Sequence, residues 1–360
     1  WIPLGSGTDD TVRSLAIDRA GNLYAGGDFN TAGGITAQRV AKWNGTAWSA
    51  LGEGLNGSVY ALEIDHAGRL FAGGWFKRVG LHYIAMWDGE SWRDLESGTN
   101  DAVLAMASDA SGNLYAGGRF TQAGGTPANH IAKWDGTSWS ALGSGLQADD
   151  GWVFVRALAV SGNDLYAAGR FTTAGGVAAS NIAKWDGTNW SALGSGIGGD
   201  NASVAYVYAL AMSGSEVYAA GDFTSAGGKT ASRIAKWNGS NWSALGSGLN
   251  YTVGALGVSG GDLYVGGGFT IAGGIAARGI AKWDGSNWSA LGSGLNEGVS
   301  ALAVSGGDLY ATGYSSTNIG KWDGKSWSAL DSAVGSGIGY PQTLTVSGGD
   351  LYAGGNLLTW

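Results

Sequence analysis

One phrase recurs along nearly the whole chain, and this repeat limits what the chain can fold into. It is clearest at residues 165–193, which read LYAAGRFTTAGGVAASNIAKWDGTNWSAL. A hydrophobic pair followed by small residues occurs eight times, beginning at Leu23, Leu70, Leu114, Leu165, Val217, Leu263, Leu309 and Leu351. A fixed period of this kind predicts a repeat architecture in which each unit is one small supersecondary structure.

Two tryptophans mark the second half of each unit. The first precedes a D-G or N-G pair, at Trp43, Trp87, Trp134, Trp185, Trp237, Trp283 and Trp322. The second begins a W-x-x-L motif, at Trp48, Trp92, Trp139, Trp190, Trp242, Trp288 and Trp327. The chain ends supply an eighth pair, because Trp1 and Leu4 have the W-x-x-L spacing and Trp360 stands where a first tryptophan is expected. Only Trp75 and Trp152 fall outside this scheme.

The unit around residue 170 illustrates the strands that we expect. Turn-forming residues separate four runs, at Val155–Val160, Leu165–Phe171, Asn181–Trp185 and Trp190–Leu193, and Thr172–Ser180 reads as a loop. Asp186-Gly187 is a strong hairpin signal, because a tight turn needs residues that tolerate positive φ. No window shows helical periodicity. Four strands per unit of roughly 45 residues are typical of a β-propeller blade.

We therefore predict an all-β fold, a single eight-bladed β-propeller of four-stranded blades. The N-terminal strand completes the C-terminal blade and closes the ring, which removes two free strand edges. Blades one to seven are expected at 11–52, 58–96, 102–143, 155–194, 207–246, 253–292 and 299–331. Blade eight combines the first three strands, within 342–360, with the last strand, within 1–7. The paired tryptophans are then buried wedges between blades and not ligand platforms.

Composition narrows the class of protein. The chain has no Cys, which excludes disulfides and thiol chemistry. Its net charge of −8, with only 20 Lys and Arg, argues against a nucleic-acid partner. No apolar run approaches the length of a membrane span. Low charge density and many Gly, Ser, Thr and Asn residues favour a secreted or cell-surface bacterial protein. The start on Trp1 is interpreted as that of a processed product or a trimmed fragment.

The repeat also resembles known families. Hydrophobic-Gly-Gly, a D-G turn and W-x-x-L resemble the kelch repeat, and A-G-G-x-F, N-I-A-K-W-D-G and W-S-A-L-G-S-G-L are more similar to Rax2-like cortical-marker repeats. The resemblance covers nearly the whole chain and implies an extracellular or cell-surface propeller, without naming a ligand. Blade two departs from it, because residues 75–80 (WFKRVG) replace the A-G-G loop.

Function is expected where the units differ. One varying position follows the Gly pair and holds Asp28, Trp75, Arg119, Arg170, Asp222, Gly268, Tyr314 and Asn356. A second lies on the innermost strand and holds Arg13, Tyr60, Leu104, Arg156, Tyr208, Gly254, Ser300 and Gln342. Two enlarged connections, at 147–154 and 198–206, add Trp152, Phe154 and Tyr206. These positions are either ordinary variable surface or a binding site at the mouth of the ring.

From these positions we predict a site for a protein or glycan partner on blades two to five, at the face of the second-to-third strand loops. Its candidate residues are Trp75, Arg119, Trp152, Phe154, Arg156, Arg170, Tyr206, Tyr208 and Asp222. The leading hypothesis is a non-catalytic binding module or a structural unit of a cell-surface assembly. The alternatives are a lectin with a carbohydrate site at the channel mouth, and an enzyme with a site there.

Motifs for metal ions and catalysis are sparse. Asp149-Asp150 is the one candidate for calcium, although such a pair is more often a solvated loop. His82 and His130 lie in equivalent loops of adjacent blades, which makes a two-histidine metal site a weak candidate. A copper-radical oxidase of the galactose oxidase kind needs a Cys–Tyr crosslink, which this chain lacks. We therefore predict no catalytic residues and no cofactor.

Overall fold

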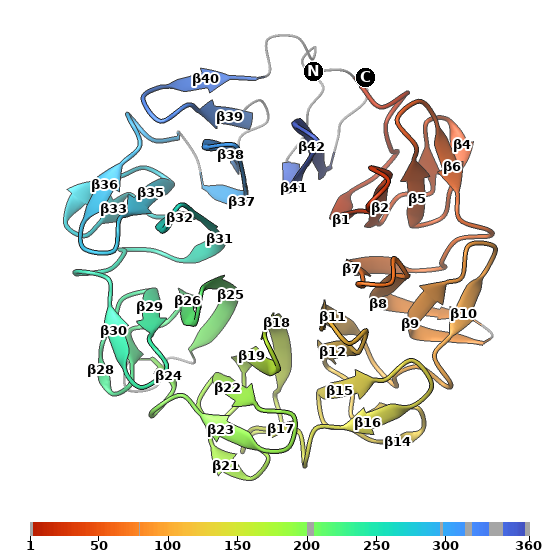
Figure 1. Ribbon diagram of the computed structural model, residues 1–360, viewed down its shortest axis with the longest axis horizontal. Helices are drawn as coiled ribbons and strands as arrows, with labels where there is room; N and C mark the ends of the chain where they lie inside the picture. Colours follow the sequence, from red (N-terminus) through yellow and green to blue (C-terminus); the bar gives the residue numbers. More distant parts are fainter. Residues whose placement is uncertain are drawn as a thin grey trace.

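The computed structural model describes residues 3–78, 80–199, 205–295, 298–313, 319–330 and 341–356. Within these ranges the chain forms strands and turns only, with no α-helix, as the sequence predicts. The strands gather into small antiparallel sheets that stand side by side around a common axis, so that the molecule is a ring (Figure 1). No described helix is long and apolar enough to span a membrane.

Seven of the described sheets have four strands, and we number them one to seven in chain order. Sheets one to four contain β1 (Val12–Ile17), β2 (Leu23–Gly27), β5 (Val40–Trp43) and β6 (Trp48–Ala50); β7 (Ser58–Ile64), β8 (Leu70–Arg78), β9 (Leu81–Trp87) and β10 (Trp92–Asp94); β11 (Val103–Ser108), β12 (Leu114–Gly118), β15 (Ile131–Trp134) and β16 (Trp139–Ala141); and β18 (Phe154–Ser161), β19 (Asp164–Arg170), β22 (Ile182–Trp185) and β23 (Trp190–Ala192).

Sheets five to seven contain β25 (Tyr206–Ser213), β26 (Glu216–Asp222), β29 (Ile234–Trp237) and β30 (Trp242–Ala244); β31 (Val253–Ser259), β32 (Asp262–Gly267), β35 (Ile280–Trp283) and β36 (Trp288–Ala290); and β37 (Val299–Ser305), β38 (Asp308–Gly313), β39 (Ile319–Trp322) and β40 (Trp327–Ala329). A further two-stranded sheet joins β41 (Pro341–Ser347) to β42 (Asp350–Gly355). The first strand of each sheet lies nearest the axis, and β41 lies against β1 (Figure 1).

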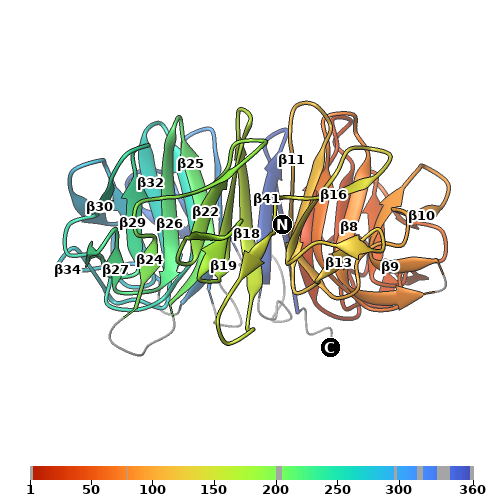
Figure 2. The same ribbon diagram turned by 90° about the horizontal axis from the view of Figure 1, so that it is seen from below.

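Short hairpins occupy part of what the sequence predicts to be loops. Residues 172–180, expected to be a loop, contain β20 (Thr173–Ala174) and β21 (Val177–Ala178), which pair with each other. Gly175 and Gly176, with φ of 58° and 80°, form the tight turn between these two strands. The equivalent hairpins are β3 (Thr31–Ala32) with β4 (Ile35–Thr36), β13 (Gln122–Ala123) with β14 (Thr126–Pro127), β27 (Ser225–Ala226) with β28 (Lys229–Thr230), and β33 (Ile271–Ala272) with β34 (Ile275–Ala276). Several of them lie toward one face of the ring, as the side view shows (Figure 2).

Sheet two lacks such a hairpin, as its departure from the repeat suggests. Here β8 and β9 extend beyond the length of their counterparts, and Lys77 pairs with His82. The side chain of Asn56 holds the extension, because its Oδ1 accepts a hydrogen bond from the Lys77 amide at 3.0 Å and its Nδ2 donates to the Lys77 carbonyl. The basic and aromatic residues of sheet two are therefore carried on a two-stranded arm whose register shifts between Gly73 and Lys77.

The paired tryptophans lie between neighbouring sheets, as predicted. Within each pair the ring centroids are 5.3–5.6 Å apart and the planes are tilted by 51–58°. None of these rings is exposed. The indole Nε1 of the second tryptophan donates to the carbonyl of the W-x-x-L leucine in the preceding unit; for example, Trp190 donates to Leu142 at 2.7 Å. Each unit is therefore tied to the one before it by an indole hydrogen bond, buried at Trp139, Trp190 and Trp242 and part-buried elsewhere.

The N-terminal residues make the same contacts as their counterparts in the inner units. Trp48 Nε1 donates to the Leu4 carbonyl at 2.6 Å, the Gly7 amide donates to Leu4, and the Gly33 amide donates to Gly7. Thr8 also forms an isolated bridge with Ala32 of the first hairpin. Residues 4–8 therefore take the place of the end of a unit that precedes sheet one. The predicted pairing of Trp1–Leu4 beside Asn356–Trp360 involves residues 1–2 and 357–360, which lie outside the described residues.

The Gly pair at the end of the second strand allows close packing, as the repeat predicts. A Cβ atom on Gly26 would lie 2.6 Å from Cγ1 of Val59 in the next sheet, and one on Gly27 would lie 2.0 Å from the Thr11 carbonyl oxygen. The core is divided among the interfaces between neighbouring sheets, and a phenylalanine such as Phe171 or Phe223 is fully buried in each of several clusters. The interfaces between neighbouring sheets are thus nearly identical along the scaffold.

Candidate functional site

The predicted site residues lie toward one face of the ring. Antiparallel pairing sets the start of each innermost strand beside the end of the second strand, so that Phe154 is opposite Arg170 and Tyr206 is opposite Asp222. In sheet two the same register places Ser58 opposite Trp75. We call this side the entry face, because the innermost strands begin there.

Three aromatic side chains form a stacked row on the entry face. Phe154, at the start of β18, stacks on Tyr206, at the start of β25, with centroids 5.8 Å apart and planes 10° from parallel. Tyr206 stacks in turn on Tyr208, at 6.0 Å and 4°. Burial, with the nearby negative charge of Asp222, raises the pKa of Tyr208, so its hydroxyl remains protonated at neutral pH. The row Phe154–Tyr206–Tyr208, called the aromatic row below, joins sheets four and five.

Exposed residues flank the aromatic row. Trp152 is 66% exposed in the connection that leads into β18, and Arg156 is exposed on β18 itself. The Arg156 side chain has no hydrogen bond or ion pair within the part of the chain that the structure describes. Tyr251, which precedes β31, is 61% exposed. Sequence reasoning did not select Tyr251, although Gly268 stands at the adjacent varying position, where a Cβ atom would come within 2.9 Å of the Tyr251 ring.

Two of the predicted site residues are held in ion pairs. Arg170 Nη1 donates to Asp150 Oδ1 at 3.0 Å, and its guanidinium also reaches Asp150 Oδ2 and the Trp152 carbonyl. The hydrogen bond from Arg170 lowers the pKa of Asp150 to about 2. Asp222 pairs with Arg233 at 2.5 Å. Arg170 therefore anchors the enlarged connection that carries Trp152, and Asp150, which with Asp149 was the one weak candidate for calcium, is already paired with an arginine.

The remaining two predicted site residues lie apart from the row. Arg119 is exposed at the end of the second strand of sheet three, and its side chain has no partner among the residues described. Trp75 is 51% exposed on sheet two and meets the ring of Tyr83 edge to face, with centroids 5.7 Å apart. The structure therefore divides the predicted site into the aromatic row and a separate location between sheets one and two.

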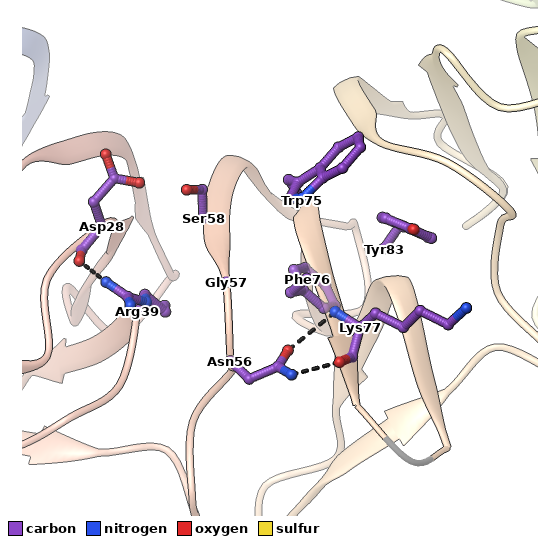
Figure 3. A pocket seen from close by; sticks show the side chains of 9 residues that line it. All are labelled: Asp28, Arg39, Asn56, Gly57, Ser58, Trp75, Phe76, Lys77 and Tyr83. Carbon is purple, nitrogen blue, oxygen red and sulfur yellow. Dashed lines mark hydrogen bonds between the residues drawn. The ribbon is translucent and has the colours of Figure 1, made fainter.

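A cavity of about 300 Å³ lies at that second location. Asp28 and Arg39 of sheet one line one side, the connection Asn56–Ser58 lies in the middle, and Trp75, Lys77 and Tyr83 of sheet two line the other side (Figure 3). Sequence reasoning selected only Trp75 of this group for the site. It noted Asp28 as a varying residue and the basic, aromatic loop of blade two, but no sequence pattern shows that these segments face one another.

Asp28 is the charged centre of the cavity wall. Its Oδ2 is 2.5 Å from Arg13 Nη2, while its Oδ1 is buried without a hydrogen-bond partner. Arg39 donates to the Asp28 carbonyl. Burial alone would raise the pKa of Asp28, but the hydrogen bond from Arg13 and the neighbouring Ser58 hydroxyl, together with the charges of Arg13 and Arg39, hold it below its ordinary value. Asp28 is therefore an ionised carboxylate with one oxygen still able to accept a hydrogen bond.

Two residues of the cavity have a strained backbone. The residue before the third strand has positive φ in five of the first six units, at Arg39, His130, Asn181, Arg233 and Gly279. In sheet two the equivalent residue, Tyr83, also has positive φ but lies within the longer strand β9. Arg39 has φ of 66° and Tyr83 has φ of 61°. Glycine avoids this strain, and large side chains rarely adopt such a conformation. Arg39 and Tyr83 thus place functional groups in the cavity at the expense of local backbone energy.

The two histidines do not converge on a metal site. His82 Nδ1 is 3.8 Å from Asp94 Oδ2. His130 occupies the positive-φ position, one residue out of register with His82, and burial lowers the pKa of its imidazole. No group of three or more His, Asp or Glu side chains in the described ranges is arranged to hold a metal ion.

Comparisons with solved structures identify the class of fold. Over 97% of this chain and 95% of the other, the structure is similar to that of the computationally designed Ika8 protein, with 18% identity and a TM-score of 0.62. It also resembles the WD40 beta propeller domain of Doa1, with 15% identity over 85% and 90% of the two chains and a TM-score of 0.50. YCF48 bound to D1 peptide matches with 15% identity over 97% and 92%, also with a TM-score of 0.50. The fold is therefore that of a β-propeller.

No protein-family model and no curated protein matches the sequence. The expected resemblance to kelch and Rax2-like repeats is therefore supported at the level of the β-propeller fold, and the particular family stays a prediction.

Proposed function

We propose that this protein is a non-catalytic binding module that uses the entry face of the propeller to hold a peptide segment of another protein. The observation that carries the proposal is the aromatic row. Tyrosine, tryptophan and arginine are the side chains that contribute most to binding energy at protein interfaces. Trp152 and Arg156 of sheet four and Tyr251 at the start of sheet six are exposed on the same face and offer both apolar surface and hydrogen-bond donors.

The similarity to other propellers is compatible with this proposal. The structure of YCF48 contains a bound D1 peptide, and the YCF48 chain has the same fold. An enzymatic role has less support, because the two carboxylates near the aromatic row, Asp150 and Asp222, are each paired with an arginine and do not form a nucleophile with a base. A glycan ligand, the alternative from the sequence, is favoured by a different feature, the cavity between sheets one and two.

Peptide binding can be tested with a random peptide library displayed on phage and selected against the immobilised protein. Counter-selection would use the double variant Tyr206→Ser and Tyr208→Ser. We expect enriched peptides to bind the parent and to lose about tenfold or more in affinity for the double variant. Val177→Ala, which changes an exposed residue of a short hairpin, is the matched control and should bind as the parent does. Peptides that bind all three proteins equally would contradict the proposal.

We also propose that the ring has eight blades with the boundaries stated above and is closed by Trp1–Leu4 beside Asn356–Trp360. Two observations support this. The two-stranded sheet β41–β42 lies against sheet one, and residues 4–8 occupy the place of the end of a preceding unit. An extracellular or cell-surface location in a bacterium is proposed from composition alone, and protease treatment of intact cells of the source would test it.

A further inference from the structure

We propose that the cavity between sheets one and two is a binding site for an acidic oligosaccharide, a chain of sugar rings that carry carboxylates. The site is distinct from the aromatic row and does not depend on the peptide-binding proposal. The argument rests on three features of its lining: an exposed aromatic surface, a local surplus of positive charge, and a buried carboxylate oxygen that lacks a donor.

The aromatic surface comes from Trp75 and Tyr83. Trp75 is 51% exposed in the part of β8 where its register with β9 shifts, and its edge-to-face contact with Tyr83 fixes the orientation of the two rings. Exposed, oriented aromatic rings provide flat apolar surface on which the C–H face of a sugar ring can pack. The arm formed by β8 and β9 has replaced the usual short hairpin here, so among the described sheets this surface belongs to sheet two alone.

The charges select for an acid. The lining residues carry two cations, Arg39 and Lys77, and one carboxylate, Asp28, which is already paired with Arg13. The Lys77 ammonium is exposed and has no partner within the described residues. In a chain whose net charge is −8, this is a local surplus of positive charge beside an aromatic surface. A cationic ligand would be repelled there, whereas a carboxylate would be attracted.

The carboxylate of Asp28 selects for hydroxyl groups. Its Oδ1 is buried and has no donor, and an unsatisfied buried acceptor favours a ligand that donates a hydrogen bond. An acidic peptide offers carboxylates to Lys77 but would bring further negative charge to Asp28. A sugar acid offers both groups, since its hydroxyls donate to Asp28 while its carboxylates accept from Lys77 or Arg39. The two walls of the cavity, carried by neighbouring sheets, are thus complementary to a chain that crosses from one sheet to the other (Figure 3).

Trigalacturonic acid and its fully methyl-esterified form are a matched pair of probes, which differ in the charge of the acid group. We expect isothermal titration calorimetry to detect binding of trigalacturonic acid to the full chain, weakened about tenfold or more by Trp75→Ala, a change of roughly 1.4 kcal/mol. Because Trp75 is half exposed, this variant should fold as the parent does. Trp152→Ala, which removes the other tryptophan that is exposed among the described residues, is the control and should bind the sugar acid with unchanged affinity.

Two further variants separate the roles of charge and hydroxyl recognition. Lys77→Gln should lower the affinity for the acid and leave that for the methyl ester unchanged. Asp28→Asn should weaken both probes, with circular dichroism confirming the fold. Absence of trigalacturonate binding at millimolar concentration, or equal binding by Trp75→Ala, would overturn the proposal. Equal or tighter binding of hexaglutamate, abolished by Lys77→Gln but not by Asp28→Asn, would also overturn it and would indicate a site for acidic peptides.

Discussion

At the scale of single residues, the same side chain has different energetic roles at neighbouring positions of one unit. Trp288 Nε1 donates to the Leu245 carbonyl at 2.7 Å, whereas Trp283 Nε1, in the same pair of rings, is buried without a partner. The sequence predicts that both are structural tryptophans, and only the tertiary structure distinguishes the one whose hydrogen bond links two units. This difference can be measured directly.

We expect Trp288→Phe to destabilise the protein more than Trp283→Phe does. Both changes remove the same ring volume, but Trp288→Phe also removes one of the two hydrogen bonds that the Leu245 carbonyl accepts, the other coming from the Gly248 amide at 3.0 Å. The loss of that bond costs about 0.5–1.5 kcal/mol. Trp283→Phe instead removes a buried N–H that has no acceptor, which offsets part of the lost packing. Urea denaturation of both variants gives the comparison. Equal losses in the two would show that the indole hydrogen bond does not stabilise the ring.

A second residue-scale prediction concerns Glu63, whose Oε1 accepts hydrogen bonds from the Ser108 amide at 3.0 Å and hydroxyl at 2.6 Å. Burial raises the pKa of Glu63 above its ordinary value. The folded state therefore holds this proton more tightly than the unfolded state, and its contribution to stability is lost as pH rises through the folded pKa. Glu63→Gln keeps an acceptor oxygen without the charge, so it should stabilise the protein at neutral pH.

The gain from Glu63→Gln should disappear at about pH 3, where the parent carboxyl is protonated in both states. Thermal unfolding of both proteins at the two pH values would show this. A parent that is more stable than the variant at neutral pH would mean that the charged hydrogen bonds to Ser108 outweigh the cost of burial.

At the scale of elements, the short hairpins show how a glycine pair specifies a local fold that strand propensity does not reveal. Residues such as Thr173–Ala174 are too few to read as a strand in the sequence. They pair because Gly175 and Gly176 turn the chain and because Gly175 packs beneath Trp190, where a Cβ atom would lie 2.7 Å from Cδ1. Gly176 has the same sign of φ, but open space surrounds it.

We therefore predict different costs for Gly175→Ala and Gly176→Ala. Gly176→Ala should lose only the energy of placing an L-residue at positive φ, roughly 1–2 kcal/mol. Gly175→Ala should lose this and a further ~1–3 kcal/mol, because the methyl group must displace the Trp190 ring. Denaturant midpoints, together with the near-ultraviolet signal of Trp190, would measure both. Similar losses in the two variants would indicate that the ring moves aside freely.

At the scale of the whole molecule, the repeat determines the shape because it repeats the interface between neighbouring sheets. Each innermost strand contacts the next, and β41 contacts β1, so the first and last innermost strands of the described chain lie side by side (Figure 1). Residues 4–8 make the same tie to sheet one that the inner units make to their followers. Stability should therefore depend on the first few residues more than it does in most domains.

Deleting residues 1–7 should lower the free energy of unfolding by several kcal/mol, because it exposes a strand edge and the apolar flank of sheet one. Trp48→Phe, which removes the indole hydrogen bond to Leu4, is the matched comparison and should cost only part of this. If the deletion costs no more than Trp48→Phe, the N-terminal segment contributes one hydrogen bond and does not close the ring.

The sequence by itself determined the four main strands of a unit, the turns and the positions of the structural tryptophans. These features depend on local residue patterns that recur in one unit after another. For example, the positions of Trp185, Asp186 and Gly187 are filled by equivalent residues in the other units. It also indicated Phe154, Tyr206 and Tyr208 as unusual, since the aromatic residues interrupt an otherwise regular pattern.

Only the tertiary structure decided which unusual residues meet. Phe154 and Tyr206 stack because two neighbouring innermost strands begin side by side, and Asp28 and Trp75 line one cavity because sheets one and two are adjacent in the ring. Arg170, by contrast, forms an ion pair with Asp150 in the preceding connection. Contacts of this kind join residues that are distant in sequence, and neither the repeat nor its spacing predicts them.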